Sequence, residues 1–155
     1  MISHYRDLYE EIGAEKSVYS GNFFKSKADY HIDHLLPWSY YPINRFWNLY
    51  PSEPSINIKK SNNIPEWTDF LEENIRSHIQ LCLSHKEHPL IRNDLKYYYY
   101  NIMKNRDLDV IGRENELIEE EIISFLKSER KKLLEIIPGR IFDPAENESE
   151  EDINH

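Results

Sequence analysis

The 155-residue chain has a single cysteine, Cys82, and only four glycines. One cysteine excludes an internal disulfide and a structural zinc ion held by cysteine pairs. No apolar run approaches the length of a membrane span, and the N-terminus has no signal-peptide pattern. These absences predict a cytoplasmic protein that makes no use of a membrane and carries no structural zinc.

Basic residues are also scarce, with 19 Lys and Arg against 28 Asp and Glu and a net charge of -9. The charge is unevenly distributed, because residues 143–155 hold six acidic residues and neither Lys nor Arg. Residues 16–65 hold six basic residues against three acidic ones. This part of the chain therefore permits contacts with phosphate groups, whereas the acidic tail is expected to be disordered.

Hydrophobic spacing predicts how the chain is organised. Apolar residues at helical spacing predict four helices, over residues 3–16, 66–84, 90–105 and 114–137. Between the first two, alternation predicts strands over 28–34 and 47–50, followed by a helix that contains Asn57. The expected fold class is α+β and mostly α. One domain over 1–142 would comprise a core at about 28–65 and a helical extension over 66–137, followed by the tail 143–155.

Several local expectations accompany this outline. Ser52 or Ser55 is expected to cap the helix that contains Asn57. Phe23 and Phe24 are expected to pack inward. The run of four tyrosines at 97–100 cannot share one helix face, so packing between helices is favoured over a platform for stacking bases.

Asp33 and His34 stand together at the end of the first predicted strand, with Asn48 on the second strand and Asn57 on the helix. Hydrolysis of a phosphodiester needs an activated water, a cation that holds the phosphate, and alignment of the two. A histidine, with a reference pKa of about 6.5, suits the general base. Carboxylate and amide oxygens suit Mg²⁺. The residue types therefore predict a one-metal nuclease site.

Other residues near this group are candidates for supporting roles. Asn48 would hold the imidazole of His34, or the loop around it, in place. Lys59 or Lys60 would contact a phosphate, with Lys60 favoured. His31 could be a further ligand or a phosphate contact, and a supporting role is favoured. Trp38 and Trp47 could stack on bases, but a place in the core is favoured.

The string IDHLLPWS at 32–39, then WNL at 47–49 and NIKKSNNIP at 57–65, resembles an HNH endonuclease motif whose third position is Asn. It is similar to the HNH domain of the RNA-guided CRISPR nucleases. The resemblance implies the ββα-metal fold, with Asp33 and Asn57 as metal ligands, His34 as the general base and Asn48 as its positioning residue. It also implies DNA cleavage with Mg²⁺, or with Mn²⁺, that leaves a 5′-phosphate and a 3′-hydroxyl.

Two departures from the family pattern matter. The cysteine pairs that bind zinc around the hairpin of many HNH proteins are missing, so Trp38, Trp47 and the later helices are expected to support the hairpin. No sequence-reading module is recognisable, so a protein partner or a second copy is expected to dock on the helices over 66–137. By analogy with the family, the setting would be antiviral defence in bacteria or a mobile element. The alternative is a catalytically silent, HNH-like helical module that docks a larger protein.

Overall fold

The computed structural model describes residues 2–137 and 141–143. The first helix, α1 (Ile2–Ile12), buries Tyr5, Leu8 and Tyr9, the stripe that predicted it. It ends at Gly13, whose φ of +77° is a left-handed conformation that suits a residue without a Cβ atom. Helices predominate over small sheets, which confirms the α+β, mostly α class at this level.

The remaining predicted helices also form. They are α3 (Asp69–Leu83), α4 (Pro89–Tyr97) with its π-helical continuation η2 (Tyr98–Ile102), and α5 (Asn115–Ile136). The hydroxyl of Thr68 accepts a hydrogen bond from the Leu71 amide and caps α3, which fixes the start of that helix. Within the described ranges no helix is long and apolar enough to cross a membrane.

The two central strands pair as an antiparallel hairpin. Strand β1 (His31–His34) lies against β2 (Leu49–Ser52), with Ile32 opposite Pro51 and Asp33 opposite Tyr50. A short 3-10 helix, η1 (Lys27–Asp29), replaces the start of the predicted first strand. Strand β2 begins and ends two residues later than predicted. Pro51, which follows the predicted end of the second strand, therefore lies within β2.

Helix α2 (Pro54–Lys60) follows the hairpin directly and begins with proline in its first turn, where the missing N–H costs no helical hydrogen bond. The predicted caps at Ser52 and Ser55 are wrong, because Glu53 occupies the N-cap position. Its carboxylate does not cap the helix and instead accepts hydrogen bonds from Ser17 and Ser20. The start of α2 is thereby tied to the segment that precedes the hairpin.

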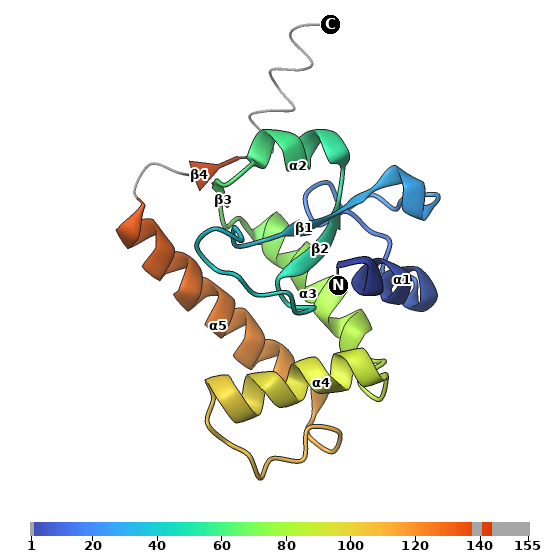
Figure 1. Ribbon diagram of the computed structural model, residues 1–155, viewed down its shortest axis with the longest axis vertical. Helices are drawn as coiled ribbons and strands as arrows, with labels where there is room; N and C mark the ends of the chain where they lie inside the picture. The colour runs from blue at the N-terminus through green and yellow to red at the C-terminus, as the bar shows by residue number, and fades with distance from the viewer. Residues whose placement is uncertain (1, 138–140, 144–155) are drawn as a thin grey trace, which may run out of the picture.

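A second sheet was not predicted. Strand β3 (Ile64–Pro65) pairs in parallel with β4 (Ile141–Phe142), so the chain beyond α5 returns to the end of the hairpin-and-helix segment. Figure 1 shows this return beside α2. The prediction of a disordered acidic tail falls almost entirely on residues 144–155, which lie outside the described residues.

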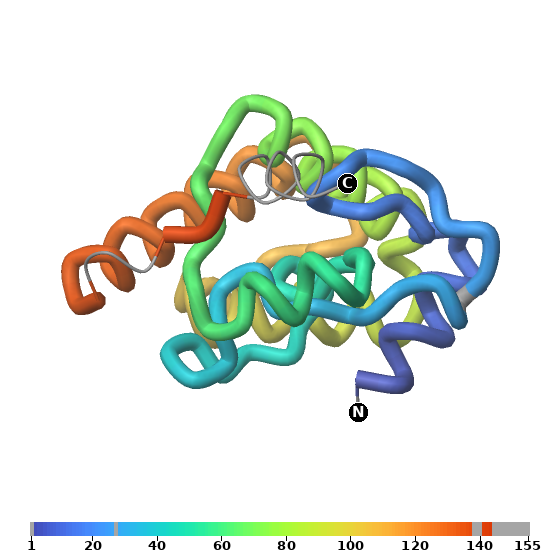
Figure 2. The backbone as a smooth tube through the Cα atoms, turned by 90° about the horizontal axis from the view of Figure 1, so that it is seen from above, coloured from blue at the N-terminus to red at the C-terminus, as the bar shows by residue number. Residues whose placement is uncertain are grey.

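One hydrophobic core joins the hairpin to the helices, and its largest fully buried side chains include Trp47, Tyr9, Tyr30, Tyr50 and Tyr98. Figure 2, seen from above, shows α5 along one side of the hairpin and α1 on the other. The core positions predicted for Trp47 and for the tyrosine run are confirmed, since Tyr98 and Tyr99 are buried.

Two predictions about aromatic packing are wrong. Trp38 is 50% exposed, because it projects from the loop after β1 and does not face the core. Phe23 is 75% exposed, although its neighbour Phe24 packs against the core. The support of the hairpin therefore comes from Trp47 and the helices, without Trp38.

Candidate active site

Helix α2 lies across one side of the hairpin. His31 and Asp33 alternate with the buried Ile32 and project from the same side of β1. Asn57 and Lys60 are three residues apart and share one face of α2. The Asn57 amide nitrogen lies 3.3 Å from Nδ1 of His31, and Nζ of Lys60 lies 3.6 Å from Oδ2 of Asp33. The fold thus brings all four side chains to one place.

Asp33 is a buried carboxylate, with only 6% of the residue exposed. The hydroxyl of Tyr19 donates a hydrogen bond of 2.6 Å to its Oδ2, the same oxygen that faces Lys60. Burial raises the pKa of Asp33, and the positive charge of Lys60 and the Tyr19 hydrogen bond oppose that change. A cation beside this carboxyl group would favour its ionised form in the same way.

Lys60 is an interior lysine. Its side chain is 1% exposed, and Nζ donates a hydrogen bond of 2.8 Å to the backbone carbonyl of His34. Burial lowers the pKa of Lys60, and the nearby Asp33 carboxylate opposes that change. This position does not favour the phosphate contact predicted for Lys60, because the ammonium already faces Asp33 and His34 in the interior. The neighbouring Lys59 is exposed.

His34 lies at the edge of the site and is partly exposed. Its Nε2 is 2.6 Å from Oδ1 of Asn44, and its ring centroid is 5.6 Å from that of Trp38. An amide oxygen only accepts hydrogen bonds, so this contact places the imidazole proton on Nε2. Nδ1 of His34 is then the nitrogen that can accept a proton.

Asn48 is fully buried and holds the loop that follows His34. Its Oδ1 accepts a hydrogen bond of 2.8 Å from the Leu36 amide, and its Nδ2 donates to the carbonyls of Leu36 and Ile43. Asn48 was expected to hold either the imidazole of His34 or the loop around it. Its contacts are those of a residue that holds the loop, and Asn44 contacts the imidazole.

The connector before the hairpin also belongs to this region. The amide of Val18 donates to the carbonyl of Pro51 on β2, and Ser17 and Ser20 bind Glu53 at the start of α2. These contacts place Tyr19 against Asp33. Burial of Tyr19 and the adjacent carboxylate raise the pKa of its hydroxyl well above the usual value, so Tyr19 remains a hydrogen-bond donor.

The sequence prediction missed Tyr19 and Asn44. Both lie in irregular segments, where neither helical nor strand periodicity indicates which way a side chain points. Only their residue types could have indicated them, because a tyrosine hydroxyl and an asparagine amide occur close in the sequence to Asp33 and His34.

Asp33 and Asn57 offer a carboxylate and an amide oxygen, the ligands that a hard divalent cation prefers, beside the imidazole of His31. In residues 2–137 and 141–143 there is no group of three or more His, Cys, Asp or Glu that could hold a metal ion. Any cation held here would therefore depend on the Asn57 amide oxygen in addition to the Asp33 carboxylate.

Comparison with known proteins gave one match, and it covers this part of the chain. Residues 17–66 match the family model of the HNH endonucleases, a stretch that covers less than half of the chain. The match begins at the connector that holds Tyr19 and ends just after β3. The predicted resemblance to the HNH endonuclease family is confirmed over this segment, and it indicates a nuclease that acts on nucleic acid. No curated protein and no solved structure gave a significant match.

Proposed function

We propose that the protein is a divalent-metal-dependent endonuclease of the ββα-metal type that hydrolyses DNA phosphodiester bonds. One observation carries the proposal: α2 places Asn57 and Lys60 against the side of β1 that bears His31 and Asp33, with His34 next to them. The order of hairpin and helix supports the ββα-metal assignment, and the proposed nuclease domain is 1–142.

Asp33 and Asn57 would hold Mg²⁺ or Mn²⁺. Tyr19 and Lys60 both contact Oδ2 of Asp33, and we assign Oδ1 to the cation. The Asn57 amide nitrogen faces His31, which directs its oxygen away from that ring. His31 thus orients the Asn57 amide, the supporting role that we propose for it. When bound, the cation would neutralise charge on the phosphate and on the leaving oxygen.

His34 would act as the general base. Because Nε2 faces Asn44, Nδ1 would take the proton from the attacking water. The water oxygen then forms a bond to phosphorus, and the bond from phosphorus to the 3′-oxygen breaks. The 3′-oxygen takes a proton from solvent water as it leaves, so the products are a 5′-phosphate and a 3′-hydroxyl. Asn48 would hold the loop behind His34, Lys60 would fix the Asp33–His34 pair, and exposed Lys59 would contact a phosphate.

The helices over 66–137 share a core with the hairpin, so we place them in the nuclease fold. They also expose the large apolar residues Phe70, Leu117 and Ile136, which suit contact with a protein partner or a second copy. The proposal includes such a partner because no sequence-reading module is recognisable in the chain. By family analogy, the setting would be the cytoplasm, in bacterial defence or a mobile element.

Cleavage of supercoiled plasmid tests the proposal. Wild-type protein should nick the plasmid with Mg²⁺ or Mn²⁺ and not with EDTA, and both His34→Ala and Asn57→Ala should abolish nicking. His85→Ala is the matched control, because His85 is an exposed histidine on the segment between α3 and α4 and should leave nicking unchanged.

Metal binding separates a silent scaffold from an enzyme. Titration calorimetry with Mn²⁺ should show binding to wild type and to His34→Ala, and loss of binding in Asp33→Ala. A wild-type protein that binds neither Mg²⁺ nor Mn²⁺ and cuts neither DNA nor RNA would refute the proposal and favour the interaction module.

A further inference from the structure

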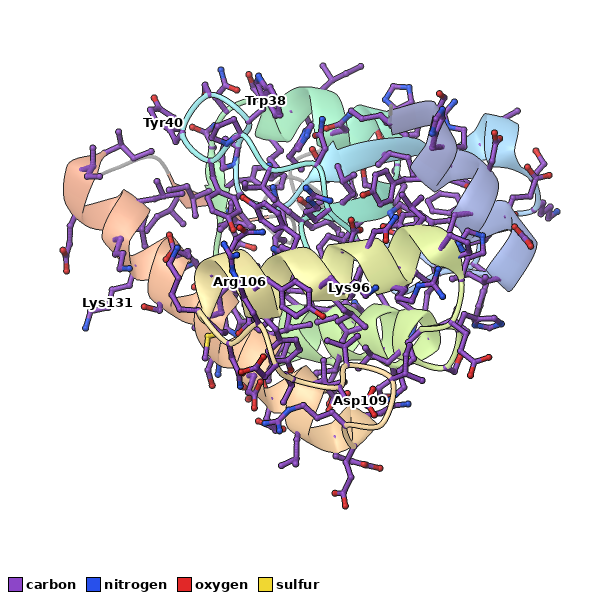
Figure 3. The ribbon with its side chains drawn as sticks, turned by 60° about the horizontal axis from the view of Figure 1, so that its bottom comes forward. Trp38, Tyr40, Lys96, Arg106, Asp109 and Lys131 are labelled. Carbon is purple, nitrogen blue, oxygen red and sulfur yellow. The ribbon has the colours of Figure 1, made fainter. Side chains whose placement is uncertain are left out.

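An exposed tryptophan stands next to the proposed general base. Trp38 is 50% exposed, and its ring lies 5.6 Å from the His34 ring, tilted by 50°. Tyr40, two residues further along the loop, is 36% exposed. Figure 3 shows both side chains at the surface of the loop that follows β1. The edge of the site therefore presents aromatic faces to solvent.

This loop is held in place on its inner side. Asn48 makes hydrogen bonds to both Leu36 and Ile43, and the amides of Tyr40 and Tyr41 donate to the carbonyl of Pro37. The exposure of Trp38 thus belongs to a loop with a defined shape. Trp47, by contrast, lies at 0% exposure in the core, so the fold does bury a tryptophan where packing requires one.

The charges around the site leave little basic surface. Of the basic residues in 16–65, Lys60 is buried against Asp33, and Arg45 makes an ion pair of 3.0 Å with Asp94. Residues 16–65 carry a net charge of +3, and these two contacts engage two of their six basic side chains. Because neutralisation of phosphates supplies most non-specific affinity for nucleic acid, a segment with few basic side chains left for phosphates gains from another source of binding energy.

We propose that Trp38, with Tyr40 beside it, is a stacking platform for a nucleobase next to the cleaved phosphate, and that the substrate is single-stranded or locally unpaired nucleic acid. The inference rests on the proposed nuclease function and adds a substrate class to it. Stacking needs a free base face, which a single strand offers and which base pairs within a duplex cover with their neighbours.

Binding without cleavage tests the platform directly. Fluorescence anisotropy would follow the inactive His34→Ala protein with a labelled oligothymidylate, the matching duplex, and a strand of the same length with abasic sites. We expect the single strand to bind more tightly than the duplex. Trp38→Ala should weaken single-strand binding by about 5- to 150-fold, the range for loss of one stacked base.

Four comparisons make the result specific. Trp38→Phe should retain most of the affinity, because it keeps a π-face. Phe23→Ala removes an aromatic residue that is more exposed than Trp38 and lines a pocket with Lys16, Ser77 and Leu81, so it should change nothing. The abasic strand should bind equally well to the His34→Ala protein, which is the parent, and to the same protein with Trp38→Ala added. Stacking is indifferent to the sugar, so an oligouridylate should show the same loss with Trp38→Ala.

Salt dependence and cleavage complete the test. Since the indole neutralises no phosphate, Trp38→Ala should leave the slope of log affinity against log salt unchanged. Equal affinity of Trp38→Ala and its parent for the single strand, or a preference for the duplex, would overturn the inference even if plasmid nicking occurs. If Trp38→Ala weakens single-strand binding as expected but the wild-type protein never cuts, the stacking inference stands and the proposed nuclease function is refuted.

Discussion

Nε2 of His34 lies 2.6 Å from Oδ1 of Asn44, and Asn44 is itself held by the helices. The hydroxyl of Tyr5 on α1 is 2.9 Å from the Asn44 carbonyl oxygen and 2.8 Å from Oδ2 of Asp94 on α4. A chain of contacts therefore runs from two helices outside the family match to the proposed base. These helices hold the geometry of the site as well as enlarging the core.

Replacement of Asn44 tests its role as a positioning residue. We expect Asn44→Ala to lower kcat about 10- to 100-fold with little change in KM, the usual effect of losing a partner that orients a catalytic histidine. Asn44→Asp should move the acid limb of the pH–rate profile to higher pH, because a carboxylate beside the imidazole stabilises its protonated form.

The control for Asn44 is Asn101→Ala, which removes an exposed asparagine on η2. It should leave the rate and the pH profile of nicking unchanged. If Asn44→Asp lowered the rate without moving the acid limb, Asn44 would have a structural role only.

The buried pair of Lys60 and Asp33 predicts a large effect on stability. Lys60→Met leaves the Asp33 carboxylate buried without its cation, which should lower the free energy of unfolding by about 3 to 5 kcal/mol in urea denaturation without metal. Lys59→Met, at the exposed neighbouring position, should change it by less than about 0.5 kcal/mol.

A second substitution distinguishes charge from packing. In the Lys60→Met background, Asp33→Asn should recover part of the lost stability, because the uncompensated charge is removed. If the double variant is less stable than Lys60→Met by the full cost of Asp33→Asn alone, the two side chains do not interact energetically.

The parts of this fold that the sequence predicted are those with a regular pattern. The i, i+3, i+4, i+7 stripe of α1 and the alternation in β1 follow directly from which face is buried. The β3–β4 pair could not be predicted, because it joins residues more than 70 positions apart and each strand has two residues. The place of Glu53 at the N-cap position escaped prediction because its carboxylate binds Ser17 and Ser20 and not the helix, a contact set by the tertiary structure.

The site shows the same division. The motif spacing brought Asp33, His34 and Asn57 into one hypothesis. In the structure Asn57 contacts His31, and Lys60 contacts both Asp33 and the carbonyl of His34. The sequence could not predict which way the side chains of Lys60 and Trp38 point, because motif spacing indicates which residues lie near one another and not which of them are buried. Lys60 proved interior and Trp38 exposed.

The buried side chain of His78 should make the stability of the fold sensitive to acid. It is buried between the rings of Tyr9 and Tyr50, and burial lowers its pKa to about 3. In the unfolded chain the pKa is about 6.5, so the unfolded state binds more protons between these values. The neutral imidazole therefore stabilises the fold fully above pH 6.5. That stability is lost as the pH falls, by up to about 1.4 kcal/mol per pH unit.

Denaturation of wild type and His78→Phe between pH 4.5 and pH 8 would isolate this effect, since a phenyl ring keeps the aromatic contacts and does not titrate. The wild-type protein should lose stability relative to His78→Phe as the pH drops below 6.5. A constant difference across the range would mean that His78 has a similar pKa in the folded and unfolded states.

Asp94 provides the last test, because it connects stability to the site. Its side chain has 0% exposure and accepts hydrogen bonds from the Tyr5 hydroxyl, Arg45 and the Phe46 amide. Asp94→Ala should lower the free energy of unfolding by about 3 kcal/mol or more, since these bonds involve a charged acceptor.

Asp94→Ala should also slow nicking at temperatures where circular dichroism shows an intact fold, because Tyr5 and the loop that bears Asn44 lose their anchor. The exposed Asp107→Ala should affect neither quantity. Full activity in a folded Asp94→Ala protein would show that the helices do not hold His34 in place.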